Sequence, residues 1–283
     1  MIVDIHTHTF PDALAARTVD KLQAMSHTQP FADGSVGALR ASMAASGVDR
    51  SVVLPVATNE RQVVHVNDAS VALDERSGET GVISFGCMHP DFAGWKGELS
   101  RLAAHGVKGI KLHPVYQGAF FDDDRYLRIL DRCAELGLVV LTHAGRDVGF
   151  PGADDFVSPA RIASAVRQTD GVTLICAHMG GWRQWEDVER LLPETGVYLD
   201  TSFALGALTP NGDGYYRPDE LALLDDAAFL HLVRAFGAER LLFGTDSPWG
   251  GQTEELRRFR ALPLTEAEQS AILGGNAVRL LGV

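Results

Sequence analysis

The sequence has few cysteines and no long hydrophobic run, and both absences exclude classes of protein. Its three cysteines, Cys87, Cys133 and Cys176, are too few and too scattered for a disulfide framework, and their apolar surroundings are typical of buried thiols. No apolar run approaches the ~20 residues that a membrane-spanning helix needs. The N-terminus also lacks a basic region followed by an apolar stretch and a cleavage site. We therefore expect a cytoplasmic protein with reduced thiols.

Positive charge is scarce as well. Lys and Arg number 25 against 37 Asp and Glu, which gives a formal net charge of −12. This balance argues against nonspecific binding to nucleic acid or to an anionic membrane. It leaves room for a local positive pocket that binds an anionic substrate. We therefore expect a small-molecule substrate as the main partner, and leave a homodimer open as the oligomeric state.

Short apolar runs alternate with helical patterns along the whole chain, and the 283 residues slightly exceed the length of a typical (β/α)₈ barrel, about 250 residues. An open, doubly wound sheet is the competing fold. It would usually show a Gly-rich phosphate loop after the first strand, and the segment 6–11 is not such a loop. We predict an α/β protein that forms a single (β/α)₈ TIM-barrel domain over residues 1–283. The predicted strands are Ile2–His6, Ser51–Ala57, Val82–Cys87, Gly109–Leu112, Leu138–Thr142, Val172–Ala177, Val197–Thr201 and Leu241–Gly244.

Two connections between predicted elements are long, one over residues 10–34 and one over residues 203–219. They follow the first and seventh strands, which places both at the C-terminal face of a barrel, where they are candidate lids or substrate-binding loops. Local signals mark some helix starts. Thr265 followed by Glu268 fits a capping box, and Asp91 is suited to cap the helix that follows it.

Histidines gather where predicted strands end. Six of the ten lie at or just beyond a C-terminal strand end: His6, His8, His89, His113, His143 and His178. In a barrel these ends converge on one mouth, where active sites are built. His6 and His8 are two residues apart and so point to the same face of a strand, from which both imidazoles can reach one ion. The pair alone is a weak signal, and it gains strength from the other histidines.

Asp246 ends the eighth predicted strand. A helix cap or a turn before Pro248 is its plainer interpretation. Three histidines and one carboxylate suit a borderline ion such as Zn²⁺ and leave room for a water molecule. A bound ion lowers the pKa of that water toward ~7, and a nearby carboxylate can take its proton. We predict one divalent metal, with Zn²⁺ favoured and Mn²⁺, Fe²⁺ or Co²⁺ as alternatives.

These motifs resemble the amidohydrolase superfamily, and more narrowly the branch that includes aminocarboxymuconate-semialdehyde decarboxylase. The resemblance implies that the metal ligands are His6, His8, His143 and Asp246. It also implies that His178 lies beside the metal-bound water and acts in catalysis together with Asp246. The motifs that carry the resemblance are Asp4–His8, Gly109–Pro114, Thr142–Gly145, Ala177–Gly181, Gly244–Asp246 and Gly275–Leu281.

Lys111, His113 and Arg146 are the candidate substrate-binding residues. Binuclear relatives carry a carboxylated lysine at the position of Lys111, but the branch resembled here is usually mononuclear, so an unmodified lysine is favoured. It would then bind an anionic substrate or turn to the surface. Arg146 could bind a carboxylate with its two-pronged guanidinium, although a solvated surface arginine is the plainer interpretation. Asp200 is a candidate to orient a histidine or to act as a structural cap.

Three functions compete. In the first, a metal-dependent hydrolase uses a metal-bound hydroxide to attack the carbonyl of an amide, lactone or ester, and its substrate is a small, anionic organic molecule. Nonoxidative decarboxylation of an unsaturated or aromatic acid is the alternative, because the resemblance includes it. A non-catalytic metal-binding scaffold would have lost a ligand or the catalytic histidine. All of these positions are filled in this sequence, so we predict an enzyme.

Overall fold

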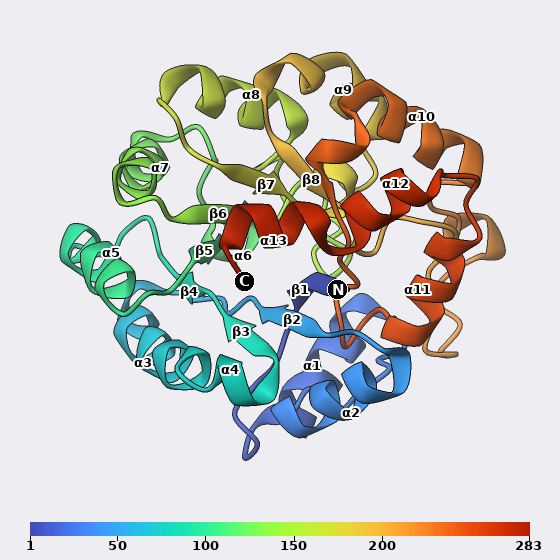
Figure 1. Ribbon diagram of the computed structural model, residues 1–283, viewed down its shortest axis with the longest axis horizontal. Helices are drawn as coiled ribbons and strands as arrows, with labels where there is room; N and C mark the ends of the chain where they lie inside the picture. Colours follow the sequence, from blue (N-terminus) through green and yellow to red (C-terminus); the bar gives the residue numbers. More distant parts are fainter. The chain divides into compact units, whose positions relative to one another are not determined.

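The computed structural model describes residues 1–283, and these residues divide into two compact units. Unit 1 comprises Met1–Val52, Val148–Pro151 and Asp200–Val283, and unit 2 comprises Val53–Asp147 and Gly152–Leu199. Figure 1 shows their elements, coloured along the sequence. The single domain that the sequence analysis predicts over residues 1–283 stays a prediction, and each unit is described by itself.

All eight predicted strands are present, and the third is divided at Phe85 into two short strands. Strands such as β1, β5 and β6 are buried along their whole length, which is why continuous apolar runs identified them. The strands are β1 (Val3–Thr7), β2 (Arg50–Val53), β3 (Val82–Ser84), β4 (Gly86–Cys87), β5 (Gly109–Leu112), β6 (Val139–Thr142), β7 (Leu174–Cys176), β8 (Tyr198–Asp200) and β9 (Leu241–Leu242).

Unit 2 is built on parallel strands. β4, β5, β6 and β7 pair with their neighbours in chain order, and the first two residues of β8 pair with β7. Leu112 is in register with Thr142, which is in register with Cys176. The C-terminal ends of β5, β6 and β7 therefore lie at one edge of the sheet, and the residues that follow them are brought together there.

Unit 1 brings together the ends of β1 and β9. The amide of Ile5 donates to the carbonyl of Phe243, and the amide of Asp246 donates to the carbonyl of His6. Just beyond β8, the Thr201 amide donates to the Leu242 carbonyl. The chain after β1, β8 and β9 thus emerges at one edge of this unit.

The helices confirm one predicted start signal and correct another. Thr265 and Glu268 form the predicted capping box. Asp91 does not cap α5, which has Gly94 at its N-cap, because the Asp91 carboxylate instead accepts a hydrogen bond from Arg125 at 2.6 Å. The α-helices are α1 (Ala15–Ser26), α2 (Val36–Ser46), α3 (Val63–Asp74), α4 (Ser77–Thr80), α5 (Trp95–Ala104), α6 (Pro114–Gln117), α7 (Asp124–Leu136), α8 (Pro159–Gln168), α9 (Trp185–Leu191), α10 (Asp226–Phe236), α11 (Gln252–Arg260), α12 (Glu266–Ser270) and α13 (Asn276–Leu281).

The first predicted long loop contains a helix. α1 occupies half of residues 10–34, and its N-cap residue, Leu14, makes no side-chain capping bond, so the sequence offers no start signal. The second loop, over 203–219, is irregular as predicted apart from the start of a 3₁₀ turn at Pro218–Glu220. The two segments meet within unit 1, where the Gln29 amide donates to the Thr209 carbonyl at 2.8 Å.

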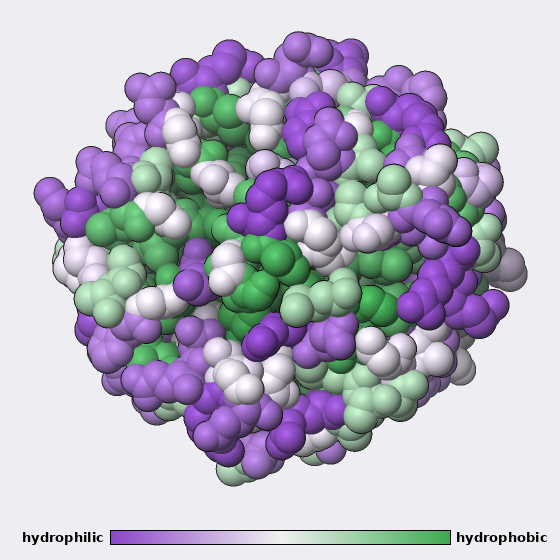
Figure 2. Space-filling model, viewed as in Figure 1, coloured by the Kyte–Doolittle hydropathy of each residue, from purple (hydrophilic) through white to green (hydrophobic).

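The three cysteines are fully buried, as predicted, and burial raises the pKa of the Cys87 thiol to about 12. None of the helices combines the length and the apolar composition that crossing a bilayer requires. Figure 2 shows hydrophilic and hydrophobic residues interspersed on the face that it displays. The cytoplasmic location stays a prediction.

The carboxylate of Glu255, in unit 1, is partly removed from water, which disfavours its charged form. Glu255 on α11 is partly buried, and removal from water raises the pKa of its side chain from 4.5 to about 7, although Arg258 opposes this shift. Because the folded-state pKa is the higher one, the charged side chain destabilises the fold above pH 7. This cost is absent below about pH 4, where the residue is protonated in both the folded and the unfolded state.

Glu255→Gln is therefore expected to increase the free energy of unfolding by about 2 kcal/mol at pH 8 and by almost nothing at pH 4. Urea denaturation at the two pH values measures the difference. Glu254→Gln, at an exposed neighbour on the same helix, is the control and should change stability by less than about 0.5 kcal/mol. Equal or lower stability of Glu255→Gln at pH 8 would contradict the argument.

Candidate metal centre

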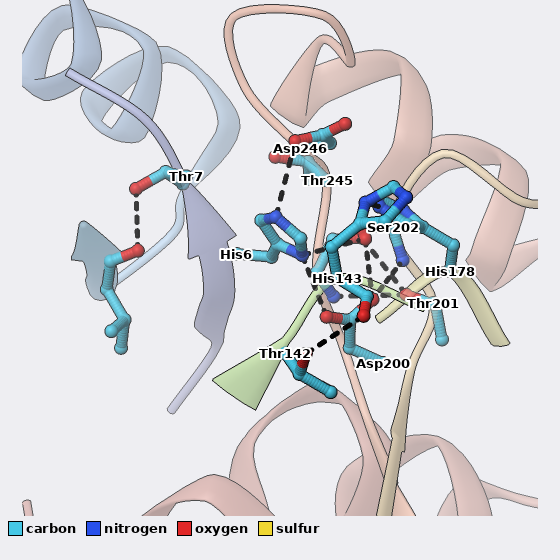
Figure 3. Close-up of polar contacts among 12 residues, drawn as sticks. His6, Thr7, Thr142, His143, His178, Asp200, Thr201, Ser202, Thr245 and Asp246 are labelled. Atoms are coloured by element: carbon cyan, nitrogen blue, oxygen red, sulfur yellow. Dashed lines mark hydrogen bonds and ion pairs between the residues drawn. The ribbon is translucent and has the colours of Figure 1, made fainter. Parts of the chain in front are cut away.

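Three donor atoms meet in unit 1. His6 Nε2 lies 3.1 Å from His8 Nε2 and 3.3 Å from Asp246 Oδ1, and His8 Nε2 lies 3.1 Å from the same oxygen. His6 belongs to β1, His8 follows that strand, and Asp246 follows β9. Figure 3 shows His6 and Asp246 facing each other. These three predicted ligands therefore lie together in the structure, and that they bind a metal stays a prediction.

A second layer of polar groups fixes the orientation of His6. Its Nδ1 lies 2.8 Å from Asp200 Oδ2 and 2.9 Å from Ser202 Oγ, and the Ser202 hydroxyl donates to Asp200 Oδ1. Because a carboxylate only accepts hydrogen bonds, the proton of neutral His6 is on Nδ1. Nε2 then presents a lone pair toward the Asp246 oxygen, which is also an acceptor. Two acceptors at this separation call for a cation between them.

The size and chemistry of this triangle fit a divalent metal. Donors about 2.1 Å from one zinc ion in tetrahedral geometry are separated by about 3.4 Å, and octahedral ions bring them somewhat closer. Two imidazoles and one carboxylate suit Zn²⁺ and related ions. Of the alternatives that the sequence left open for Asp200, orientation of a histidine is the one that the structure shows.

The backbone at Asp246 is strained. Asp246 has a φ of 63°, in the left-handed region that non-glycine residues seldom adopt. The preceding residue is held by Asp4, whose carboxylate accepts hydrogen bonds from the Thr245 amide at 3.0 Å and the Thr245 hydroxyl at 2.6 Å. Gln252 donates to the same carboxylate at 2.8 Å. Asp4 therefore ties β1 to the turn that presents Asp246.

Unit 2 holds a second cluster of imidazoles. His178 Nε2 lies 3.1 Å from His143 Nδ1, and the His143 ring stacks on His113 with 4.3 Å between centroids. Asp147 Oδ2 lies 3.5 Å from His113 Nε2 and 3.9 Å from His143 Nε2. Figure 3 shows His143 and His178 side by side. His178, like Asp246, has a positive φ, of 58°.

Glycine beside His143 has a packing role. Gly145 has a φ of 83°, and a Cβ added there would lie 2.2 Å from the Trp182 amide nitrogen. The small residues of the His-Ala-Gly motif therefore let two backbone segments approach each other.

The remaining predicted residues differ in their placement. Lys111 on β5 is 1% exposed, so its interpretation as a surface lysine is wrong. Arg146 is exposed, and its backbone carbonyl contacts His143 Nε2 at 3.1 Å. His89 lies in a turn, where its Nδ1 accepts a hydrogen bond from the Asp91 amide at 3.2 Å.

The predicted four-ligand set takes His6, His8 and Asp246 from unit 1 and His143 from unit 2. That His143 binds the same ion stays a prediction. The substrate-binding roles of Lys111, His113 and Arg146 and the catalytic role of His178 stay predictions as well. Asp4, Asp147 and Ser202 are site residues that the sequence analysis missed.

Asp200→Asn is expected to weaken metal binding by about 10- to 100-fold, because the amide cannot hold His6 with its proton on Nδ1 as a carboxylate does. Titration of metal-free protein with Zn²⁺ against a competing chelator measures the affinity. Asp219→Asn, at an exposed loop position, is the control and should bind metal like the unmodified protein. Unchanged affinity in Asp200→Asn would show that this carboxylate does not support the site.

Comparison with solved structures shows the fold. The chain is similar to an uncharacterized TIM-barrel protein from Bordetella bronchiseptica, with 19% identity, a TM-score of 0.73, and coverage of 99% of this chain and 98% of that one. A 5-carboxyvanillate decarboxylase from Sphingomonas paucimobilis matches with 16% identity, a TM-score of 0.67 and coverage of 100% and 99%. A putative 2-pyrone-4,6-dicarboxylic acid hydrolase from Pseudomonas putida matches with 20% identity, a TM-score of 0.65 and coverage of 99% and 97%. The predicted TIM-barrel fold is confirmed.

Family membership follows from the sequence. No curated protein matches the chain. The family described as Amidohydrolase matches residues 3–283, almost the whole chain, including every motif on which the resemblance rests. The chain therefore belongs to the amidohydrolase family and is an enzyme of the amidohydrolase type.

Proposed function

We propose that the protein is a metal-dependent hydrolase of a small organic substrate with an amide, lactone or ester bond. The observation that carries the proposal is the triangle of His6, His8 and Asp246 donor atoms, backed by Asp200. His143 completes the ligand set according to the sequence motifs. Zn²⁺ is our first choice, and one similar structure, a dihydroxybenzoic acid decarboxylase, contains manganese.

In this proposal, different side chains of the protein have separate roles in the reaction. A bound divalent ion polarises a carbonyl and lowers the pKa of a water molecule. Asp246 accepts the proton of the attacking water, since its side chain is 12% exposed and its Oδ1 belongs to the donor triangle. His178 donates a hydrogen bond to the carbonyl oxygen or returns the proton to the leaving group. Asp200 keeps His6 in one tautomer throughout.

Decarboxylation is the second candidate function, because several of the similar structures are decarboxylases. They include a 5-carboxyvanillate decarboxylase and a 2,6-dihydroxybenzoate decarboxylase as well as a putative 2-pyrone-4,6-dicarboxylic acid hydrolase. All of these names describe acids, which supports the expectation of an anionic substrate. Lys111, His113 and Arg146 are its proposed binding residues in unit 2.

A panel of lactones and aromatic acids tests the proposal, with carbon dioxide release measured alongside ring opening. We expect ring opening without carbon dioxide, and about a tenfold or larger preference in kcat/KM for lactones that carry a carboxylate, as one well-placed ion pair gives. Arg146→Ala should reduce that preference. Arg279→Ala, which removes an exposed arginine that hydrogen-bonds within the C-terminal region, should leave it unchanged. Carbon dioxide release from the acids, without lactone hydrolysis, would favour the decarboxylase.

A further inference from the structure

Unit 1 contains a pocket that none of the proposed roles uses. Its volume is about 170 Å³, slightly more than a cavity of about 150 Å³ that holds a benzene molecule. Segments that follow β1, β8 and β9 supply its walls, so it lies at the edge where the strands of this unit end. Residues that line it include Phe31, Phe203, Leu205, Trp249, Glu255 and Arg258.

Two residues that line the pocket adjoin residues of the candidate metal centre. Phe203 directly follows Ser202, whose hydroxyl contacts His6 Nδ1 at 2.9 Å. The amide of Trp249 donates to the carbonyl of Asp246 at 2.8 Å. The pocket is therefore built on the segments after β8 and β9 that also carry Ser202 and Asp246.

Glu255 is a charged residue of this pocket whose carboxylate is only weakly stabilised by the protein. Its carboxylate makes no hydrogen bond or ion pair within the protein, and its Cγ lies against Gly250. The nearest cation is committed elsewhere, because Arg258 Nη1 donates to the Leu205 carbonyl at 2.6 Å. The Arg258 guanidinium also packs on Gly206, where an added Cβ would lie 2.2 Å from Nη1. Glu254 and Arg257, the other charged lining residues, are exposed at the rim.

We propose that this pocket binds an apolar group carrying a protonated amine, with Glu255 as the acceptor of its N–H bonds. A partly buried carboxylate is stabilised more by a cation than by a neutral donor. The aromatic side chains of Phe31, Phe203 and Trp249 supply apolar surface and attract a cation through their ring faces. The destabilising charge of Glu255 is then compensated by the ligand.

That this pocket is part of the substrate-binding site rests on the proposed function, whereas its binding of an amine does not. If both hold, the substrate carries an amine-bearing apolar end in addition to the group that reacts. Burying a carboxylate that has no partner in the protein is a cost that a ligand-binding role explains. Recognition by charge at this pocket also disfavours substrates that would place a carboxylate beside Glu255.

Isothermal titration of the metal-loaded protein tests the inference with three matched probes: 2-phenylethylammonium, neutral 2-phenylethanol and anionic 3-phenylpropionate. We expect the ammonium to bind at least ten times more tightly than the alcohol, and the propionate to bind most weakly to this pocket. Glu255→Gln should remove the preference for the ammonium while retaining the alcohol. Glu266→Gln, at an exposed position outside the pocket, should retain the preference.

Two further measurements separate this inference from the proposed function. Asp246→Asn, which should be inactive, is expected to bind the ammonium normally, showing that binding does not occur through the metal. In the active enzyme the ammonium should inhibit competitively, and Glu255→Gln should lose this inhibition. Equal affinity for ammonium and alcohol, or a preference that survives Glu255→Gln, would overturn the pocket assignment. Binding without competitive inhibition would overturn the substrate-subsite role.

Discussion

Replacing Asp246 with asparagine is expected to reduce kcat by about 10³-fold or more, because the side chain then lacks the charge to bind the metal and the basicity to take a proton. Asparagine has nearly the same shape and tolerates the left-handed backbone that Asp246 adopts at a φ of 63°. The turn and the hydrogen bonds of Asp4 to Thr245 should therefore survive. The loss would then report on chemistry and not on folding.

Steady-state kinetics with a substrate identified in the lactone panel, together with metal analysis of the same samples, measures both consequences of Asp246→Asn. Thermal unfolding confirms that the variant is folded. Asp12→Asn, at an exposed position early in the chain, should keep both turnover and metal. An Asp246→Asn variant with normal turnover would show that this carboxylate does no chemistry and that our choice of ligands is wrong.

His178→Asn is expected to lower kcat by about 10²- to 10⁴-fold, the usual contribution of a general acid or base, while the metal content stays near that of the unmodified protein. His178 touches His143 in unit 2 and has a φ of 58°, which asparagine accommodates. Its carbonyl also accepts a hydrogen bond from Trp185 Nε1 at 3.0 Å, so the backbone should hold its position.

The comparison that decides the role of His178 is with His143→Asn. We expect His143→Asn to lose metal and activity together, because the family motif makes it a ligand. His105→Asn, at an exposed histidine of the same unit, serves as the control for histidine replacement. Equal loss of metal from His178→Asn and His143→Asn would refute the separate roles that we assign.

Strands were predicted well from the sequence because strands of a parallel sheet are covered on both faces. β5 and β6 are buried at every residue, which makes them continuous apolar runs. Helix α1 was missed because its start carries no capping residue and its first turn has no acidic side chain. Where a cap is formed by local side chains, as at Thr265 and Glu268, the prediction was correct.

The ligand residues of unit 1 could be predicted for a similar reason. His6 and His8 follow from the two-residue period of a strand, and Asp246 from its place at a strand end. The side chains that hydrogen-bond to these ligands could not be predicted, because such contacts join distant parts of the chain. Ser202 contacts His6 across 196 residues, and no spacing rule covers such a pair.

The sequence also did not allow us to predict which charged side chains are buried and which are exposed. Lys111 and Arg146 were treated alike as cations near strand ends, yet Lys111 is buried within β5 and Arg146 is exposed. The difference arises because Lys111 lies in the sheet, between neighbours in register with it on β4 and β6. Arg146 lies beyond the strand, in a loop whose course the sequence pattern does not describe.

An anomalous difference map, from crystals of protein purified without added metal, would show whether the side chains of His6, His8 and Asp246 bind one ion. We expect a single strong peak about 2.0 to 2.2 Å from His6 Nε2, His8 Nε2 and Asp246 Oδ1. We also expect that exhaustive chelation removes both the peak and the activity. The absence of a peak beside these three atoms, in a protein that stays active in chelator, would contradict the proposed metal centre.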